Sequence, residues 1–268
     1  MLATARALSI MAVLGAGAVA QGAEPVRLYA AGSLRAAMEE IGAAFARRSG
    51  TAVVGEFGAS GLLRDRIARG ASAEVFASAN MAHPRALAAA GRAGPVVLFA
   101  RNRLCALAAP RVNVTSETLL ERMLDPAVKL GTSTPKADPS GDYAWELFDK
   151  ADAARPGASK ALAEKALQLT GGPDSAPPAK DRSVYGMLVT RGDADIFLTY
   201  CTNALVAQKE APTLRIVAIP SALAVGADYG LTVIDGASPA AREFAQFVLS
   251  GPGQGILLRH GFTPVALP

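Results

Sequence analysis

The sequence predicts an α/β protein built from two α/β domains with mostly parallel sheets, joined by crossover strands. Strand-like and helix-like segments alternate between residues 26 and 78 and again between residues 129 and 208, which is typical of parallel βαβ units. Strand-like stretches at 96–108 and 214–234 lie where the chain would pass between the domains. Of the 268 residues, 51% are hydrophobic and 19% charged, so the chain is long enough for two small domains and too apolar to be disordered.

The first alternation starts with a short β-rich run and a small turn that precedes an amphipathic helix. In that helix, apolar side chains recur every three or four positions, Ser33 stands where an N-cap belongs, and Gly50 stands where the helix would end. Glycines bound the segments that follow. The expected elements are strands at 26–30, 51–57 and 74–78 and helices at 34–48 and 62–68.

The second alternation contains the most obvious surface loop, the Gly- and Pro-rich segment 171–178. Two strand-like halves at 96–108 precede it, and further strands are expected at 129–131, 195–200, 214–219 and 229–234. Helices are expected at 118–123, 143–150, 160–169, 182–191, 202–208, 239–249 and 254–260. Because the tail would return to the first domain, we expect domain I at 24–100 and 222–268 and domain II at 101–221.

The first 23 residues are typical of a secretory signal peptide. Arg6 supplies a positive start, residues 7–17 are nearly all apolar, and Ala18–Ala20 fits a cleavage site, although a cut after Ala23 fits equally well. The apolar run is shorter than the roughly 20 residues of a membrane anchor, and no Cys for lipid attachment lies near the cut. We therefore expect export to the periplasm, with the signal peptide (1–23) removed and a soluble mature chain.

Charge and residue usage argue against several classes of function. The net charge is +4, and no basic run carries interleaved aromatics, so we expect no nucleic-acid partner. The two His and two Cys are far apart, so we expect no metal cluster of these residues. The segment Phe57–Gly61 lacks the spacing of a G-x-S-x-G nucleophile elbow. We therefore expect a binding protein and not an enzyme. The alternative from a different functional class is a secreted serine hydrolase.

Small polar residues recur where a strand ends and a helix begins. Ser33, Ser60 and Ser140 hold such places, and the starts near Arg182 and Tyr200 are related. In parallel α/β sheets, ligands bind beyond the carboxyl ends of strands, where helix N-termini offer free N–H groups to an anion. Each serine taken alone is more simply a helix cap. Several such residues at equivalent places in the two halves of the chain predict one cleft that receives hydrogen-bond donors from both sides.

Several segments, in this order and spacing, resemble the periplasmic molybdate-binding proteins of ABC transporters. The similarity extends over nearly the whole mature chain. The segments are Ala30–Leu34, Phe57–Gly61, Ala73–Ala79, Asp138–Ala144, Gly192–Tyr200 and Gly251–Thr263.

The resemblance implies a class II periplasmic binding protein that holds a tetrahedral oxyanion between two domains with neutral donors. The two serines that the family contributes from its first domain match Ser33 and Ser60. The two backbone donors match Ser140 and a position at about Arg182, and the tyrosine hydroxyl matches Tyr200. An arginine at 182 would either add a charged donor or face solvent. The implied partners are the oxyanion and an inner-membrane ABC permease, with no cofactor, and we expect a monomer.

The chemistry of the anions agrees with such a site. Molybdate and tungstate carry no proton at neutral pH, so a site of donors alone suits them, whereas hydrogen phosphate needs an acceptor as well. No carboxylate is implied at the matched positions. Sulfate is also deprotonated but smaller, so the same fold binding sulfate or another small anion is the nearest alternative.

Two cysteines, Cys105 and Cys201, are both expected in domain II. Export would place them in an oxidising compartment, where a bridge could hold the Tyr200 segment against the crossover strand. Two buried free thiols are the alternative, because Cys is often buried. The sequence leaves both open.

Overall fold

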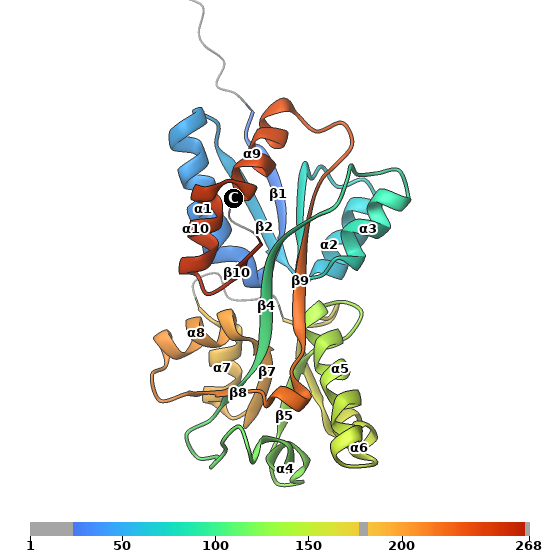
Figure 1. Ribbon diagram of the computed structural model, residues 1–268, viewed down its shortest axis with the longest axis vertical. Coiled ribbons are helices and arrows are strands. Elements are labelled where there is room, and N and C mark those ends of the chain that lie inside the picture. Colours follow the sequence, from blue (N-terminus) through green and yellow to red (C-terminus); the bar gives the residue numbers. More distant parts are fainter. Residues whose placement is uncertain (1–23, 177–181, 266–268) are drawn as a thin grey trace, which may run out of the picture.

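The computed structural model describes residues 24–176 and 182–265. These residues form an upper and a lower half, each with strands at its centre and helices on both sides, and the long strands β4 and β9 run through both halves (Figure 1). The predicted α/β class with two groups of parallel strands and connecting crossovers is confirmed. The segment assigned to the signal peptide, 1–23, lies outside the described residues.

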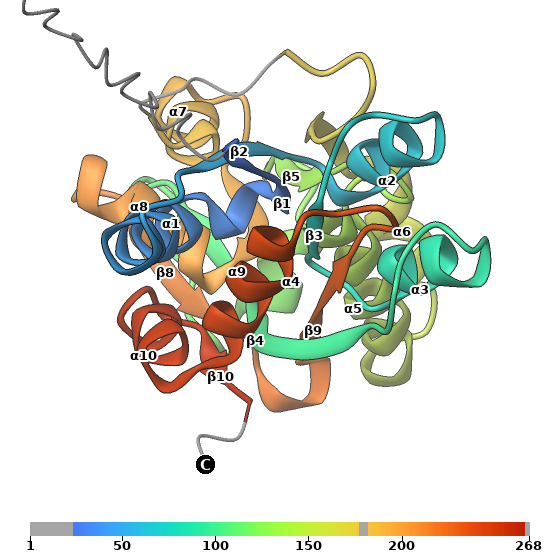
Figure 2. The same cartoon turned by 90° about the horizontal axis from the view of Figure 1, so that it is seen from above.

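The upper half holds the start and the end of the described chain. Its N-terminal elements are β1 (Val26–Ala31), the short 3₁₀ turn η1 (Gly32–Leu34), α1 (Arg35–Ser49), β2 (Val53–Gly58), α2 (Ser60–Ala68), β3 (Val75–Ser78) and α3 (Ala82–Ala89). Its C-terminal elements are α9 (Pro239–Leu249), α10 (Gly251–Arg259) and β10 (Thr263–Pro264). Seen from above, α1 and α10 lie on one side of the central strands and α2 and α3 on the other (Figure 2).

The lower half is formed by the middle of the chain. Its elements are α4 (Leu119–Leu124), β5 (Leu130–Ser133), α5 (Pro139–Ala154), α6 (Ala158–Lys165), β6 (Leu167–Thr170), α7 (Val184–Arg191), β7 (Ile196–Tyr200), α8 (Cys201–Glu210), β8 (Arg215–Ala218) and the turn η2 (Ser221–Leu223). The strands that connect the halves are β4 (Val97–Ala108) and β9 (Gly226–Val233), which pair antiparallel. The predicted domain boundaries at 100/101 and 221/222 stay predictions, and they fall within or next to these connecting segments.

The strands form one continuous sheet in the order β2-β1-β3-β9-β4-β7-β5-β6, and β8 and β10 also pair with β4. Strands β1, β2 and β3 are mutually parallel, as are β5, β6 and β7, whereas the pairs that involve β4 or β9 are antiparallel. Parallel strands place their carboxyl ends on one edge, so the residues after β1, β2, β5 and β7 are directed to the region between the halves.

The main differences from the sequence prediction lie in three places. The stretch 160–169, predicted as one helix, is α6 followed by β6, because Leu167–Thr170 pairs in parallel with β5. The segment 96–108, predicted as two strand-like halves, is one strand, because Arg101–Arg103 keeps its pairing with β9. A helix at Ala82–Ala89 was not predicted, although Pro84 in its first turn is a typical helix-start signal.

A disulfide joins Cys105 of β4 to Cys201, the first residue of α8, with 4.9 Å between the Cα atoms. Of the two alternatives that the sequence left open, the structure therefore has the bridged one. Both residues are nearly fully buried. Because Cys201 directly follows Tyr200, the bridge fixes the end of β7 against the crossover strand.

Two hydrogen bonds connect the halves beside the cavity described below. The backbone N–H of Gly61, at the start of α2, donates to the carbonyl oxygen of Ala137 at 2.8 Å. A Cβ on Gly61 would lie 2.6 Å from that oxygen, so only glycine allows this approach. The Tyr143 hydroxyl of α5 donates to the carbonyl oxygen of Ala79 at 3.5 Å. Within the described ranges, none of the helices has both the length and the hydropathy of a membrane span.

Candidate functional site: a cavity between the two halves

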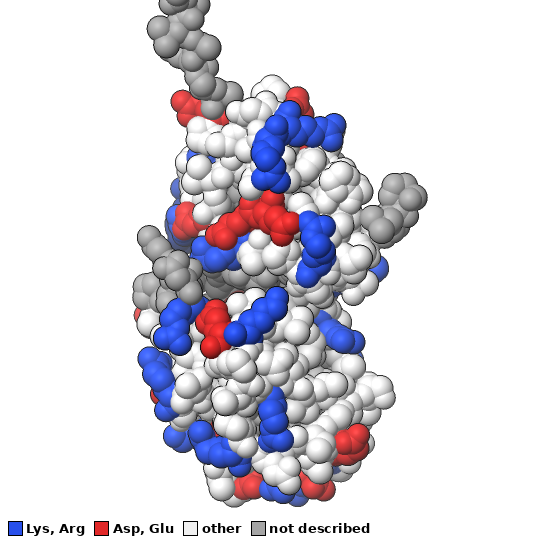
Figure 3. Space-filling model, turned by 90° about the vertical axis from the view of Figure 1, so that its left-hand side faces the viewer, with Lys and Arg blue, Asp and Glu red and all other residues white. Residues whose placement is uncertain are grey.

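A cavity of about 570 Å³ is lined by residues of both halves. Its upper wall comes from η1, α1, the end of β2 and α2, and its lower wall from the starts of α5 and α7, the loop after β6, and α8. On the face shown in Figure 3, an acidic cluster lies between basic side chains on the upper half, and basic side chains predominate on the lower half. Three of the five residues predicted to bind an anion line the cavity: Ser33, Arg182 and Tyr200.

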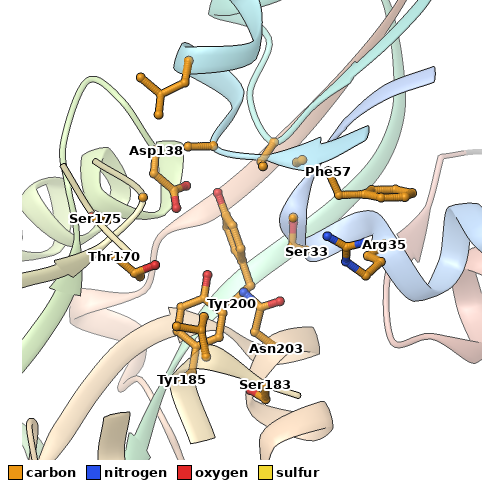
Figure 4. A pocket seen from close by; sticks show the side chains of 18 of the residues that line it. Ser33, Arg35, Phe57, Asp138, Thr170, Ser175, Ser183, Tyr185, Tyr200 and Asn203 are labelled. Atoms are coloured by element: carbon orange, nitrogen blue, oxygen red, sulfur yellow. The ribbon is translucent and has the colours of Figure 1, made fainter. Parts of the chain in front are cut away.

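Ser33 lies in the 3₁₀ turn that follows β1, and its side chain is half-buried at the cavity wall. Its Oγ is 2.9 Å from the Tyr229 hydroxyl, which also accepts a hydrogen bond from Asn102 at 3.3 Å. Tyr229 is fully buried, so this contact holds the serine from behind while its outer side faces the cavity. Figure 4 shows Ser33 beside Phe57 and Tyr200.

Ser60 is the first residue of α2 and only 1% exposed. Its Oγ accepts a hydrogen bond from the backbone N–H of Ala79 at 3.1 Å, and within the described residues its own proton has no acceptor. Ser60 itself does not line the cavity, but its neighbours Ala59 and Ala79 do. The hydroxyl is therefore directly behind the wall and keeps a donor free.

Tyr200, the last residue of β7, brings a buried hydroxyl to the cavity. The residue is 2% exposed, and its hydroxyl has no hydrogen-bond partner within the described residues. Burial raises the pKa of this phenol well above its ordinary value, and the nearby Tyr229 and Asp138 add to the effect. Tyr200 is therefore a neutral donor that lacks an acceptor, which is the costly state for a buried polar group.

Helix α7 points its N-terminus at the cavity. Its N-cap is Ser183, whose Oγ accepts from the Gly186 N–H at 3.2 Å and whose own N–H donates to the Glu210 carboxylate. The N–H groups of Val184 and Tyr185, the first two helical residues, have no acceptor within their helix, and both residues line the cavity. The free amides of this helix thus lie two and three residues beyond Arg182, the position matched from the sequence.

Arg182 precedes the N-cap, is exposed, and makes no ion pair with another described residue. The other two arginines at the cavity are already engaged. Arg35 stacks on the Phe57 ring at 4.7 Å, and Arg66 pairs with Glu56, whose pKa it lowers, and donates to the Tyr29 hydroxyl at 3.0 Å. Arg182 is thus the lining arginine whose side chain is least constrained.

Ser140 is the second residue of α5 and is fully buried. Its N–H, the backbone donor matched from the sequence, already donates to Oδ1 of Asp138 at 3.1 Å, and its Oγ has no partner among the described residues. Asp138, the N-cap of α5, lines the cavity in its place. The sequence analysis did not select Asp138, although an Asp directly before a helix-starting proline is a strong N-cap signal.

The three serines are not helix caps, which removes the simpler interpretation of their recurrence. Residue 31 caps η1 and residue 59 caps α2 without a side-chain bond, and Asp138 caps α5. Within the described residues, no group of three or more His, Cys, Asp or Glu side chains is placed to hold a metal ion. The arrangement offers neutral donors from both halves to one shared cavity, which is the chemistry of anion binding.

A continuous sheet with crossover strands and a cavity between two α/β halves defines the architecture of two-lobed solute-binding proteins. The model of the family "Bacterial extracellular solute-binding protein" matches residues 26–263. The chain belongs to this family.

Relatives and solved structures extend the comparison. An uncharacterized protein of Pasteurella multocida (strain Pm70) is 35% identical over 240 residues, covering 89% of this chain and 98% of the relative. The molybdate-binding protein ModA of Mycobacterium tuberculosis (strain H37Rv) is 30% identical over 257 residues, covering 90% of this chain and 85% of the relative.

Among solved structures, the sulfate-binding protein SubI of Mycobacterium tuberculosis has a TM-score of 0.76 at 18% identity, covering 91% of this chain and 88% of that one. The periplasmic molybdate-binding protein of Azotobacter vinelandii has a TM-score of 0.67 at 18% identity, covering 91% and 99%. At these identities the two structures establish the fold.

Proposed function

We propose that this protein captures molybdate or tungstate in the cavity between its halves and delivers the ion to an ABC permease in the inner membrane. The observation that carries the proposal is the Tyr200 hydroxyl, a buried neutral donor without a partner that faces the same cavity as Ser33 and the free amides of α7. The relative named as a molybdate-binding protein covers most of the chain and supports this ligand.

In this proposal the anion is bound by hydroxyl groups of Ser33, Ser60 and Tyr200 and by backbone amides. The sequence matched the amide donor of α7 to a position at about Arg182. Because the helix begins at Val184, the proposal assigns this donor to the Val184 N–H instead. From α5, the proposed donor is the Ser140 hydroxyl, which is buried and has no partner among the described residues. The Ser140 N–H is not available, because it already donates to Asp138. Closure of the halves about β4 and β9 would enclose the ion.

Cleavage of residues 1–23 and release into the periplasm belong to the same proposal. Capture outside the cytoplasmic membrane is what the family name describes. The disulfide between Cys105 and Cys201 supports an oxidising compartment. We propose a monomer without cofactor that presents its loaded form to the permease.

A second candidate is a sulfate or a small organic anion in the same cavity. It is supported by the cavity's volume of about 570 Å³, which lies in the range of sites for small organic molecules. The exposed side chain of Arg182 at the cavity wall, which pairs with no other described residue, supports it as well. The similarity to a sulfate-binding protein concerns the fold and does not identify the ligand of this chain. It is the reason to include sulfate among the anions that are tested.

A thermal-shift panel of molybdate, tungstate, sulfate, phosphate, chromate and a phosphorylated hydroxy acid tests both candidates. At a hundredfold excess over Kd, a bound anion adds about 2.7 kcal/mol to the free energy of unfolding. We expect molybdate and tungstate to raise the melting temperature and sulfate to leave it unchanged. A shift with the organic anion alone would favour the second candidate, and a panel without any shift would refute oxyanion binding.

A further inference from the structure

The Asp138 carboxylate lies where an incoming oxyanion is expected at α5. As the N-cap it accepts the Ser140 N–H at 3.1 Å, and its side chain points into the cavity toward the ring of Tyr200 (Figure 4). The N-terminus of α5 therefore already faces a negative charge that belongs to the protein. Any anion that binds beside it meets a carboxylate as well as the hydroxyl donors.

The groups around Asp138 are hydroxyls and a further acid. Gly171, in the loop after β6, approaches so closely that a Cβ would lie 2.6 Å from Oδ2. The charged group that influences it is Asp142, one turn along α5, and no cation contributes among the described residues. Hydroxyl-bearing residues near enough to interact with Asp138 lie on β5, α7, β7 and β9, namely Ser133, Tyr185, Tyr200 and Tyr229.

Compared with an exposed aspartate, the Asp138 carboxyl group is easier to protonate in this environment. Burial raises the pKa of Asp138 to about 6, and the Asp142 charge acts in the same direction, against the hydrogen bond from the Ser140 amide. At neutral pH the free protein carries mostly the carboxylate. A bound dianion would raise this pKa further, because two like charges at short distance do not both stay ionised.

We propose that Asp138 couples ligand binding in the cavity to protonation, so that an oxyanion binds together with one proton shared with this carboxyl group. The inference rests on the proposed function. A monohydrogen oxyanion such as phosphate brings the proton itself and donates it to the Asp138 carboxylate. A fully deprotonated oxyanion such as molybdate binds as the proton moves from solvent to Asp138, whose O–H then donates to the anion.

The test uses Asp138→Asn in the full mature chain. Asparagine caps helices as well as aspartate and has the same shape, so α5 keeps its N-cap while the titrating group is lost. The matched control is Asp142→Asn, which removes the same charge one turn further along the same helix. The Asp142 carboxylate accepts the Lys136 N–H at 2.7 Å and does not line the cavity. Thermal unfolding without ligand checks that both variants fold.

Calorimetry with molybdate in two buffers of different ionisation heat counts the protons taken up. At pH 7 we expect about one proton per anion for the parent and for the Asp142 variant, and none for Asp138→Asn. Between about pH 6.5 and 8.5, molybdate affinity should fall about tenfold per pH unit in the parent and stay level in Asp138→Asn. Phosphate should lose at least tenfold in affinity for Asp138→Asn relative to the parent.

The outcomes separate the inference from the proposed function. Molybdate bound by the parent without proton uptake and with level affinity would overturn the role of Asp138 and leave oxyanion binding intact. Proton uptake that persists in Asp138→Asn would also overturn it. Failure of every oxyanion to bind the parent at any pH would overturn both. Phosphate bound alone, with the loss in Asp138→Asn, would support the role of Asp138 and replace molybdate as ligand.

Discussion

Replacing Tyr200 with Phe should change stability and affinity in opposite directions. The substitution removes a hydroxyl that is buried, faces the cavity and has no partner in the described part of the chain. The aromatic ring keeps its edge contacts with Tyr143 and Tyr229, at centroid distances of 6.3 and 5.6 Å. The packing around residue 200 is thus preserved, and the variant isolates the hydroxyl.

The magnitudes follow from the cost of an unsatisfied polar group. A buried hydroxyl without a partner costs about 1–3 kcal/mol, so ligand-free Tyr200→Phe should be more stable than the parent by about that amount. A hydrogen bond to a charged ligand contributes about 1.5–3 kcal/mol, so the variant should bind molybdate roughly 10–150-fold more weakly. The Tyr200 hydroxyl thus lowers the stability of the ligand-free protein and raises the affinity for the anion.

Denaturant unfolding without ligand and calorimetry with molybdate measure the two effects. The matched control is Tyr229→Phe, because that hydroxyl is equally buried but bonded to Ser33 and Asn102 and lies outside the cavity lining. This control should lose about 1 kcal/mol of stability. A Tyr200→Phe protein that is less stable than the parent and binds molybdate equally well would refute the reasoning.

Three further predictions concern the disulfide and the other expected ligand residues. The double variant Cys105→Ala/Cys201→Ala should lose about 2–5 kcal/mol in denaturant unfolding, because the bridge closes a loop of 96 residues, and equal stability with and without reductant in the parent would contradict this. Ser33→Ala and Ser60→Ala should each weaken molybdate binding about 10–150-fold, and parental affinity of both variants in calorimetry would show that the site is wrongly assigned. Arg182→Ala should leave molybdate binding nearly unchanged, because the residue is exposed and the free amides of α7 lie beyond it; a tenfold or greater loss would assign its guanidinium to the anion.

Local patterns predicted most elements because they depend on near neighbours in the chain. The apolar spacing of residues 34–48 and the glycine at 50 are sufficient to define α1, whose C-cap is Gly50. Where the deciding partner is distant, the pattern misleads. Leu167–Thr170 carries helical spacing, but pairing with β5 makes it a strand, and pairing with β9 keeps β4 continuous through its three polar residues.

The sequence by itself determined the α/β class, the resemblance to anion-binding relatives and the hydroxyl residues of the proposed site, namely Ser33, Ser60, Ser140 and Tyr200. Only the tertiary structure decided that Cys105 and Cys201 come within 4.9 Å, that α7 frees its amides at Val184, and that Asp138 occupies the start of α5 beside the cavity. The physical reason is that helix caps and the apolar spacing of a helix depend on a few consecutive residues. The side of a cavity to which a carboxylate turns is instead set by elements far along the chain, here by Gly171, where a Cβ would lie 2.6 Å from Oδ2 of Asp138.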